Sequence, residues 1–234
     1  MLRQKPTLYV ALALFFVAEA VLGLALQLAE GRAVACLSYG AVLLACLFCT
    51  AFARRTSRYI LTQLALILTL GADYFLVLAP KRQQLPAMLF FSAVQICYFL
   101  RLYLADKSKM RRRIHLLCRV VLSLAMLAVT LGVLGEGADA LALVSMFYYA
   151  NLVLNLVFAL LAGKGQRRLA AGLFFFFLCD TVIGLSLVGN YLPIAADFPL
   201  YIVLFPGFNL AWAFYVPAKF LLSVSAWESD GKGG

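Results

Sequence analysis

Charged residues and histidine are the scarcest features of this 234-residue sequence. Only 13% of the residues are charged, whereas 65% are hydrophobic, which is too apolar for an ordinary soluble domain. The apolar residues form continuous runs of about 20, the length that a helix needs to cross a bilayer, and they do not alternate with polar residues as membrane strands do. The sequence therefore predicts an all-α, polytopic integral membrane helical bundle.

Charges interrupt the apolar runs at intervals close to one membrane thickness, and these interruptions define about eight transmembrane helices. The predicted spans are 8–29, 34–53, 59–79, 86–104, 114–135, 140–162, 168–189 and 200–224. We predict a single eight-helix transmembrane domain over residues 1–226. Residues 227–234 are expected to form a short flexible cytoplasmic tail.

Basic residues are concentrated in alternate loops of this scheme. They are Arg54, Arg55 and Arg58; Lys107, Lys109, Arg111, Arg112 and Arg113; and Lys164, Arg167 and Arg168. The positive-inside rule assigns these loops and both termini to the cytoplasmic side, in the cell membrane if the protein is bacterial. The net charge of +10 then indicates contact with anionic lipid headgroups and no nucleic-acid partner.

The scarcity of histidine limits the kinds of catalytic site that the protein can have. His115 is the only histidine, so a His-rich zinc site has no ligand set and a Ser-His-Asp triad has no base within the membrane. The pair Cys46 and Cys49 has the C-x-x-C spacing but lies in an apolar run, where cysteine usually behaves as a small hydrophobic residue. We predict no metal and no cofactor, and any hydrolysis must use carboxyl groups.

Two aspartates lie near the middle of predicted spans. Asp73 is about 14 residues, or roughly 21 Å, from the cytoplasmic start of its span, and Asp180 is about 12 residues, or roughly 18 Å, from the start of its own. Both spans run outward, so we expect the two carboxyls to share one depth. The four phenylalanines at 174–177 are interpreted as a lipid- or acyl-facing wall that keeps Asp180 dry.

Ionisable groups in the middle of a membrane cost free energy, and they usually face the bundle interior or a water-filled cavity. Two carboxyls at one depth suit acid/base catalysis, because burial and mutual repulsion can leave one protonated beside an ionised partner. The alternative is that each carboxyl pairs with Asn, Tyr or Lys to fix helix packing. Glu19 also lies mid-span and is interpreted as a packing or cavity residue.

The position of Lys219 depends on where the last helix begins. Pro199, Pro206 and Pro217 interrupt this segment. If the regular helix starts near Pro206, the Lys219 side chain reaches the carboxylate layer; if it starts near residue 200, the side chain extends to the cytoplasmic interface. The sequence leaves both possibilities open.

Four segments resemble the YhhN/TMEM86 family of lysoplasmalogenase-type membrane proteins over about residues 59–224. They are LALILTLGADYFLVL, MLFFSAVQICYFLRL, AAGLFFFFLCDTVIGLSL and AWAFYVPAKFLLSVS. The family has eight predicted helices. Its motif aspartates match Asp73 and Asp180, although here an alanine separates Asp73 from the glycine. Gln95 stands where the family commonly has histidine, and Lys219 where it commonly has glutamine.

The resemblance implies cleavage of the vinyl-ether bond of lysoplasmalogens, which releases a fatty aldehyde and a glycerophospho-alcohol. Asp73 and Asp180 are then the predicted catalytic residues. The predicted substrate-binding residues are Gln95, Tyr98, Tyr215 and Lys219. The expected partner is a lysophospholipid or another single-chain lipid.

Three alternatives remain at this point. A divergent member of the family can bind or hydrolyse another lipid, with its carboxyls as remnants. Buried acids, a lysine and a proline-broken helix are also typical of a small proton-coupled transporter, although no clear inverted repeat is present. A purely structural membrane subunit predicts that replacing Asp73 and Asp180 by asparagine alters stability alone.

Overall fold

The computed structural model describes residues 5–52, 56–192 and 209–227, and these ranges contain eight α-helices and no strand. Seven of the helices are long and apolar enough to cross a membrane. The helices are α1 (Lys5–Leu28), α2 (Arg32–Phe52), α3 (Ser57–Asp73), α4 (Gln84–Ala105), α5 (Lys109–Leu134), α6 (Ala140–Leu161), α7 (Arg167–Val188) and α9 (Leu210–Ser225). The predicted all-α, multi-pass membrane bundle is confirmed.

The last predicted span differs most from the structure. The sequence predicts a helix over 200–224, whereas α9 is described only from Leu210 and is 16 residues long. Asn209 caps its start by accepting a hydrogen bond from the backbone N–H of Trp212, which ties the first turn to a defined position. Residues 200–208 of the predicted span, and the predicted tail from 228 onward, lie outside the described residues.

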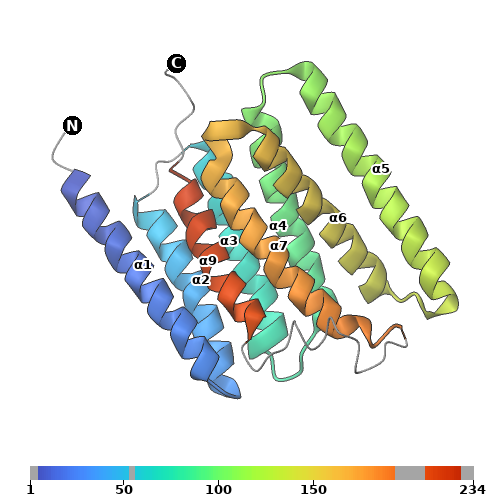
Figure 1. Ribbon diagram of the computed structural model, residues 1–234, viewed down its shortest axis with the longest axis horizontal. Coiled ribbons are helices and arrows are strands. Elements are labelled where there is room, and N and C mark those ends of the chain that lie inside the picture. Colours follow the sequence, from blue (N-terminus) through green and yellow to red (C-terminus); the bar gives the residue numbers. More distant parts are fainter. Residues whose placement is uncertain (1–4, 53–55, 193–208, 228–234) are drawn as a thin grey trace.

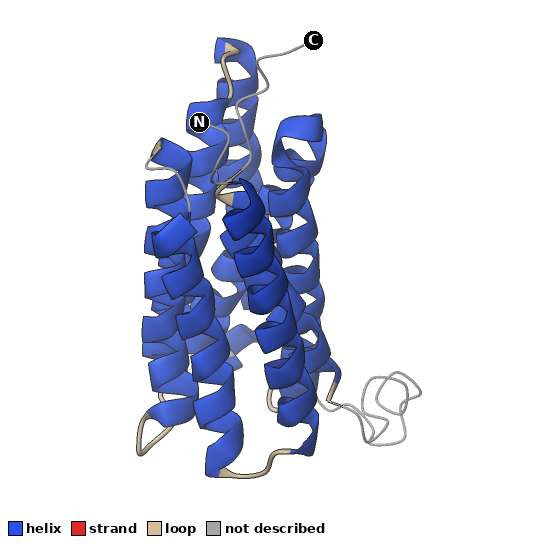
Figure 2. Cartoon of the chain, turned by 90° about the vertical axis from the view of Figure 1, so that its left-hand side faces the viewer, coloured by secondary structure: helices blue, strands red, loops and turns tan. Residues whose placement is uncertain are grey.

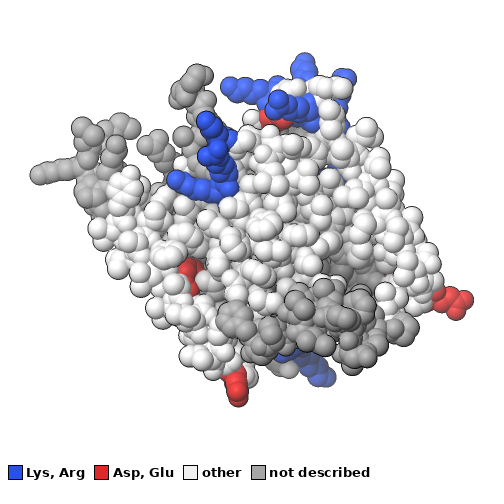
Figure 3. Space-filling model, in the orientation of Figure 1, with Lys and Arg blue, Asp and Glu red and all other residues white. Residues whose placement is uncertain are grey.

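The helices run up and down through one bundle, with α1 at one edge and α5 at the other (Figure 1). The view from the side shows their axes aligned along the long dimension of the bundle (Figure 2). The starts of α1, α3, α5 and α7 and the end of α9 lie at the same end, which we call the basic end (Figure 1). Most of the visible lysines and arginines gather there (Figure 3), as the charge pattern predicts; the side of the membrane that this end faces stays a prediction.

Local sequence signals set the helix boundaries. Gly31, Gly135 and Gly163 have φ angles of 57°, 53° and 71° at the turns after α1, α5 and α6, a conformation that other residues rarely adopt. The side chains of Ser108 and Asp139 accept hydrogen bonds from backbone N–H groups in the first turns of α5 and α6. These short turns make successive helices antiparallel neighbours.

The helices α7 and α9 approach each other closely at Gly172. A Cβ atom on Gly172 would lie 2.9 Å from the backbone nitrogen of Leu222, nearer than real Cβ atoms come. Leu222 and Leu173 are both fully buried in the core that α3, α4, α6, α7 and α9 share. This contact fixes the position of α9 beside α7, and therefore the position of Lys219 relative to Asp180.

Candidate functional site

Asp73 is the last residue of α3 and is buried, with 5% of its surface exposed. The chain continues into a single π-helical turn, Tyr74–Leu78, and such turns are frequent at functional sites. The hydroxyl of Tyr215, which is buried on α9, donates a hydrogen bond to Oδ2 of Asp73. A carboxyl of α3 is therefore held against the last helix of the bundle.

Asp180 lies on α7 and has a matching arrangement. The hydroxyl of Tyr148, buried on α6, donates a hydrogen bond to Oδ2 of Asp180. The next residue, Thr181, shares a 2.8 Å hydrogen bond with the hydroxyl of Tyr149 and donates another of 2.7 Å to the carbonyl of Phe177. Each aspartate thus accepts a hydrogen bond from a tyrosine on a different helix.

Lys219 lies in the bundle interior, and none of its surface is exposed. Its Nζ atom is 3.9 Å from the ring centroid of Phe176 and 4.5 Å from that of Tyr215, and it has no hydrogen-bond partner among the described residues. The two aspartates are within electrostatic range of the ammonium group and of each other. Of the two positions that the sequence leaves open, the structure places Lys219 in the carboxylate layer.

Glu19 of α1 faces the same region. Only 2% of its surface is exposed, both carboxyl oxygens lack a hydrogen-bond partner among the described residues, and the side chain is within electrostatic range of Lys219. Buried polar groups are normally hydrogen-bonded, so unpaired ones call for an explanation such as water or a ligand. We call Glu19, Asp73, Asp180 and Lys219 the acid–lysine cluster.

The four phenylalanines at 174–177 do not form one wall. Phe174 is 46% exposed, whereas Phe176 is fully buried beneath the ammonium of Lys219. Successive residues of a helix point about 100° apart, so four in a row must face several directions. The lipid-facing alternative is wrong for Phe176, which presents its ring face to a cation inside the bundle, whereas the acyl-facing alternative stays a prediction.

Gln95 and Tyr98 are both fully buried on α4. Oε1 of Gln95 accepts a 2.9 Å hydrogen bond from Asn155 of α6, and its side chain lies beside the Tyr148 hydroxyl that bonds Asp180. The Tyr98 hydroxyl and Nε2 of Gln95 have no hydrogen-bond partner within the described residues. Gln95 therefore lies next to the Asp180 side of the cluster.

The sequence matches the YhhN family over residues 34–226, the range from α2 to the end of α9. The chain belongs to the YhhN family. Comparison with curated proteins and with solved structures returns no match. The YhhN match includes Asp73, Asp180 and Lys219 but begins after α1, so it does not include Glu19.

The interpretation of the sequence missed two arginines that lie inside the bundle, Arg101, which is buried, and Arg119, which is half-buried. Arg101 of α4 is 1% exposed and donates hydrogen bonds to Thr62 (2.7 Å), to Gln166 (3.2 Å) and to the hydroxyl and carbonyl oxygens of Ser225 (2.7 and 2.8 Å). The sequence analysis gave it no role. Arg101 joins α4 to α3, α9 and the turn before α7 at the basic end of the YhhN bundle.

Arg119 of α5 is the second of these arginines and is half-buried. It donates hydrogen bonds to Asn151 and, at 2.7 Å, to Asn155, and its guanidinium lies 4.3 Å from the ring centroid of Phe99. Asn155 in turn bonds Gln95, so a polar chain runs from α5 through α6 to α4. The only signal in the sequence was an arginine inside a predicted span, five residues from its start.

No three His, Cys, Asp or Glu side chains gather as metal ligands in the described ranges. The acid–lysine cluster instead combines three carboxyls and one ammonium group inside the bundle, and the hydroxyls of Tyr148 and Tyr215 bond two of the carboxyls. Such groups can hold, donate and accept protons, and their electrostatic interactions are strong because water is scarce around them.

Proposed function

We propose that this member of the YhhN family is a membrane-embedded hydrolase that cleaves the vinyl-ether bond of lysoplasmalogens. The observation that carries the proposal is the pair Asp73 and Asp180: a buried and a half-buried carboxyl on different helices, each bonded to a tyrosine and both within electrostatic range of Lys219. The proposed substrate is a single-chain lipid, whose alkenyl chain can remain in the bilayer while its polar part enters the bundle.

The chemistry requires one acid and one base. A protonated carboxyl adds a proton to the β-carbon of the vinyl ether, which gives an oxocarbenium ion at the α-carbon. Water adds to this carbon, and its proton passes to the ionised carboxyl. The hemiacetal then loses the glycerol oxygen as an alcohol, so one water is consumed and one aldehyde and one alcohol are formed.

The surrounding residues suit these roles. The ammonium of Lys219 favours an ionised carboxyl in its vicinity, and this carboxylate can stabilise the oxocarbenium ion and accept the proton from water. The hydroxyls of Tyr148 and Tyr215 hold the two carboxyls in fixed orientations. In the proposal, Gln95 and Tyr98 contact the substrate with their free polar atoms, which in the described residues lack partners.

The test is release of aldehyde by the purified protein in detergent. The substrate is a lysoplasmalogen, and the analogue with a saturated ether is the negative control, because it cannot be protonated at carbon. In D₂O the aldehyde should carry one deuterium beside the carbonyl. We expect Asp73→Asn and Asp180→Asn each to abolish turnover, whereas Glu30→Gln, which neutralises an exposed carboxyl, should retain it.

Three results would overturn the proposal. The first is no aldehyde from the folded wild-type protein. The second is full activity in both aspartate variants. The third is solute uptake into proteoliposomes that depends on Asp73 or Asp180 without any aldehyde release, which would favour the proton-coupled transporter. Binding of the lipid without turnover would favour a lipid-binding protein.

A further inference from the structure

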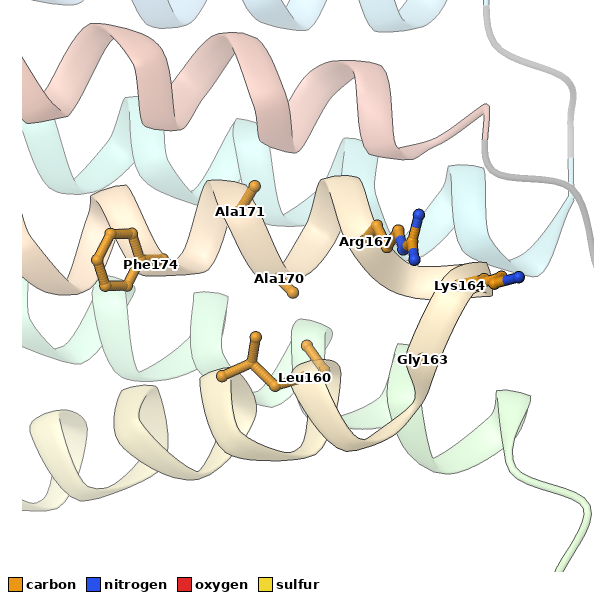
Figure 4. A pocket seen from close by; sticks show the side chains of 8 residues that line it. Leu160, Gly163, Lys164, Arg167, Ala170, Ala171 and Phe174 are labelled. Atoms are coloured by element: carbon orange, nitrogen blue, oxygen red, sulfur yellow. The ribbon is translucent and has the colours of Figure 1, made fainter.

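A groove of about 520 Å³ opens between the end of α6 and the start of α7, at the basic end of the bundle. It is separate from the acid–lysine cluster, because Asp180 lies 13 residues, or about 20 Å, along α7 from Arg167 at the groove's mouth. Figure 4 shows the two helices joined through the turn at Gly163, with Leu160 and Ala170 between them. The chemistry proposed for the cluster does not use this space.

Small residues create the groove. Ala159 on α6 and Ala170 and Ala171 on α7 line it, and Gly163 forms the turn that joins the helices. Ala159 and Ala170 are almost completely buried, so the helices are close at the floor of the groove. The space above the floor is open because no larger side chain fills it.

The lining changes from charged to apolar along the helix axes. Lys164 and Arg167 are exposed at the mouth (Figure 4), and the groove has no acidic lining residue. Leu160 and Phe174, 61% and 46% exposed, form its apolar walls. Phe174 lies seven residues beyond Arg167 on α7, which places it about 10 Å deeper along the helix.

This order of charges matches the order of groups in an anionic phospholipid. Cations next to the membrane surface attract negatively charged headgroups. An acyl chain attached to such a headgroup extends toward the bilayer centre, the direction in which the lining becomes apolar. A soluble phosphate would use only the mouth of the groove and leave the apolar walls uncovered.

We propose that this groove binds one anionic phospholipid, with its phosphate between Lys164 and Arg167 and an acyl chain along Leu160 and Phe174. The bound lipid covers the junction of α6 and α7, the helices that carry Tyr148 and Asp180. Binding here does not depend on the proposed hydrolysis, so either proposal can fail without the other.

The test is native mass spectrometry of the purified full-length protein in a neutral detergent, titrated with phosphatidylglycerol or with phosphatidylcholine of the same chains. We expect one phosphatidylglycerol to be retained, with an affinity on the order of tenfold higher than that of phosphatidylcholine. The double variant Lys164→Ala/Arg167→Ala should lose this difference.

Two further variants distinguish a defined lipid-binding groove from nonspecific attraction of the lipid to the basic end. Ala171→Phe keeps both cations but fills the groove, and it should also weaken phosphatidylglycerol binding. Lys107→Ala/Lys109→Ala removes two exposed cations from the preceding basic loop, and it should leave binding unchanged. The lysines and the arginine are exposed and Ala171 is half-buried, and retained helical circular dichroism checks that all variants fold.

Equal affinities for the two lipids in the wild type would overturn the proposal. So would an equal loss of binding in the variants of the two loops, because this would indicate unspecific attraction to the basic end. Glycerol 3-phosphate has the charge of the headgroup but no acyl chain. If it displaces the lipid at similar concentrations, the groove is a phosphate site and not a lipid site.

Discussion

The two tyrosines that bond the aspartates offer a direct test of the proposed mechanism. Tyr148→Phe and Tyr215→Phe each delete one hydroxyl and leave the ring, so that the aromatic face that Tyr215 presents 4.5 Å from Lys219 is retained. A hydrogen bond to a charged group contributes about 1.5–3 kcal/mol. Because 1.4 kcal/mol corresponds to tenfold, kcat/KM should fall by about 10- to 100-fold in each variant.

The matched control is Tyr149→Phe. This tyrosine adjoins Tyr148 on α6, but its hydroxyl bonds Thr181 at 2.8 Å and no carboxyl. It should retain kcat/KM within a few fold while losing a similar amount of stability. The assay is aldehyde release from a lysoplasmalogen, with thermal unfolding in the same detergent as the measure of stability.

The comparison discriminates between a catalytic pair and a packing pair. If Tyr148→Phe and Tyr215→Phe lower only the unfolding temperature, and by as much as Tyr149→Phe, then the hydroxyls serve packing and the assigned roles of the aspartates are refuted. A loss of kcat/KM confined to the two variants that contact carboxyls supports the proposed chemistry.

Three further substitutions test other parts of the structure. Gly172→Ala places a Cβ atom 2.9 Å from the backbone of α9 and should destabilise the protein by about 1–3 kcal/mol in thermal unfolding, whereas Gly184→Ala, where nothing lies within 4 Å, should not. Lys219→Met should reduce aldehyde release at least tenfold without loss of the fold; unchanged turnover would contradict the role of the ammonium. Arg101→Met leaves several buried acceptors unpaired and should cost about 3 kcal/mol or more, measured by denaturation in detergent.

The architecture could be predicted from the sequence because apolar length is a local property. Seven predicted spans correspond to long helices, since each run of about 20 apolar residues has a single stable solution in a bilayer. The final span could not be predicted as well. Its start depends on Asn209 as a cap and on packing against Gly172, and neither is apparent from hydropathy.

The candidate site could be predicted where a single charged residue lies in an apolar run, because burying that charge costs free energy. It could not be predicted where the interaction partners are far apart in the sequence. Asp73 and Asp180 attracted attention as isolated charges in apolar runs, and both are directed to the interior. Arg101 was missed because its burial depends on Ser225, 124 residues away in the sequence. Glu19 was interpreted as a packing or cavity residue, because its relation to Lys219 exists only after α1 and α9 come together.

The proline within α9 gives this helix two mechanically different halves. Pro217 has no N–H, so the carbonyl of Ala213 lacks its usual helical partner, and bending is easiest at this point. Beyond it, Arg101 secures the final turn through Ser225. On the other side, Tyr215 is attached to the rest of the bundle through Asp73. A bend at Pro217 would therefore swing Tyr215 away from its carboxyl while Lys219 stayed in place, and access to the interior would be coupled to release of Asp73.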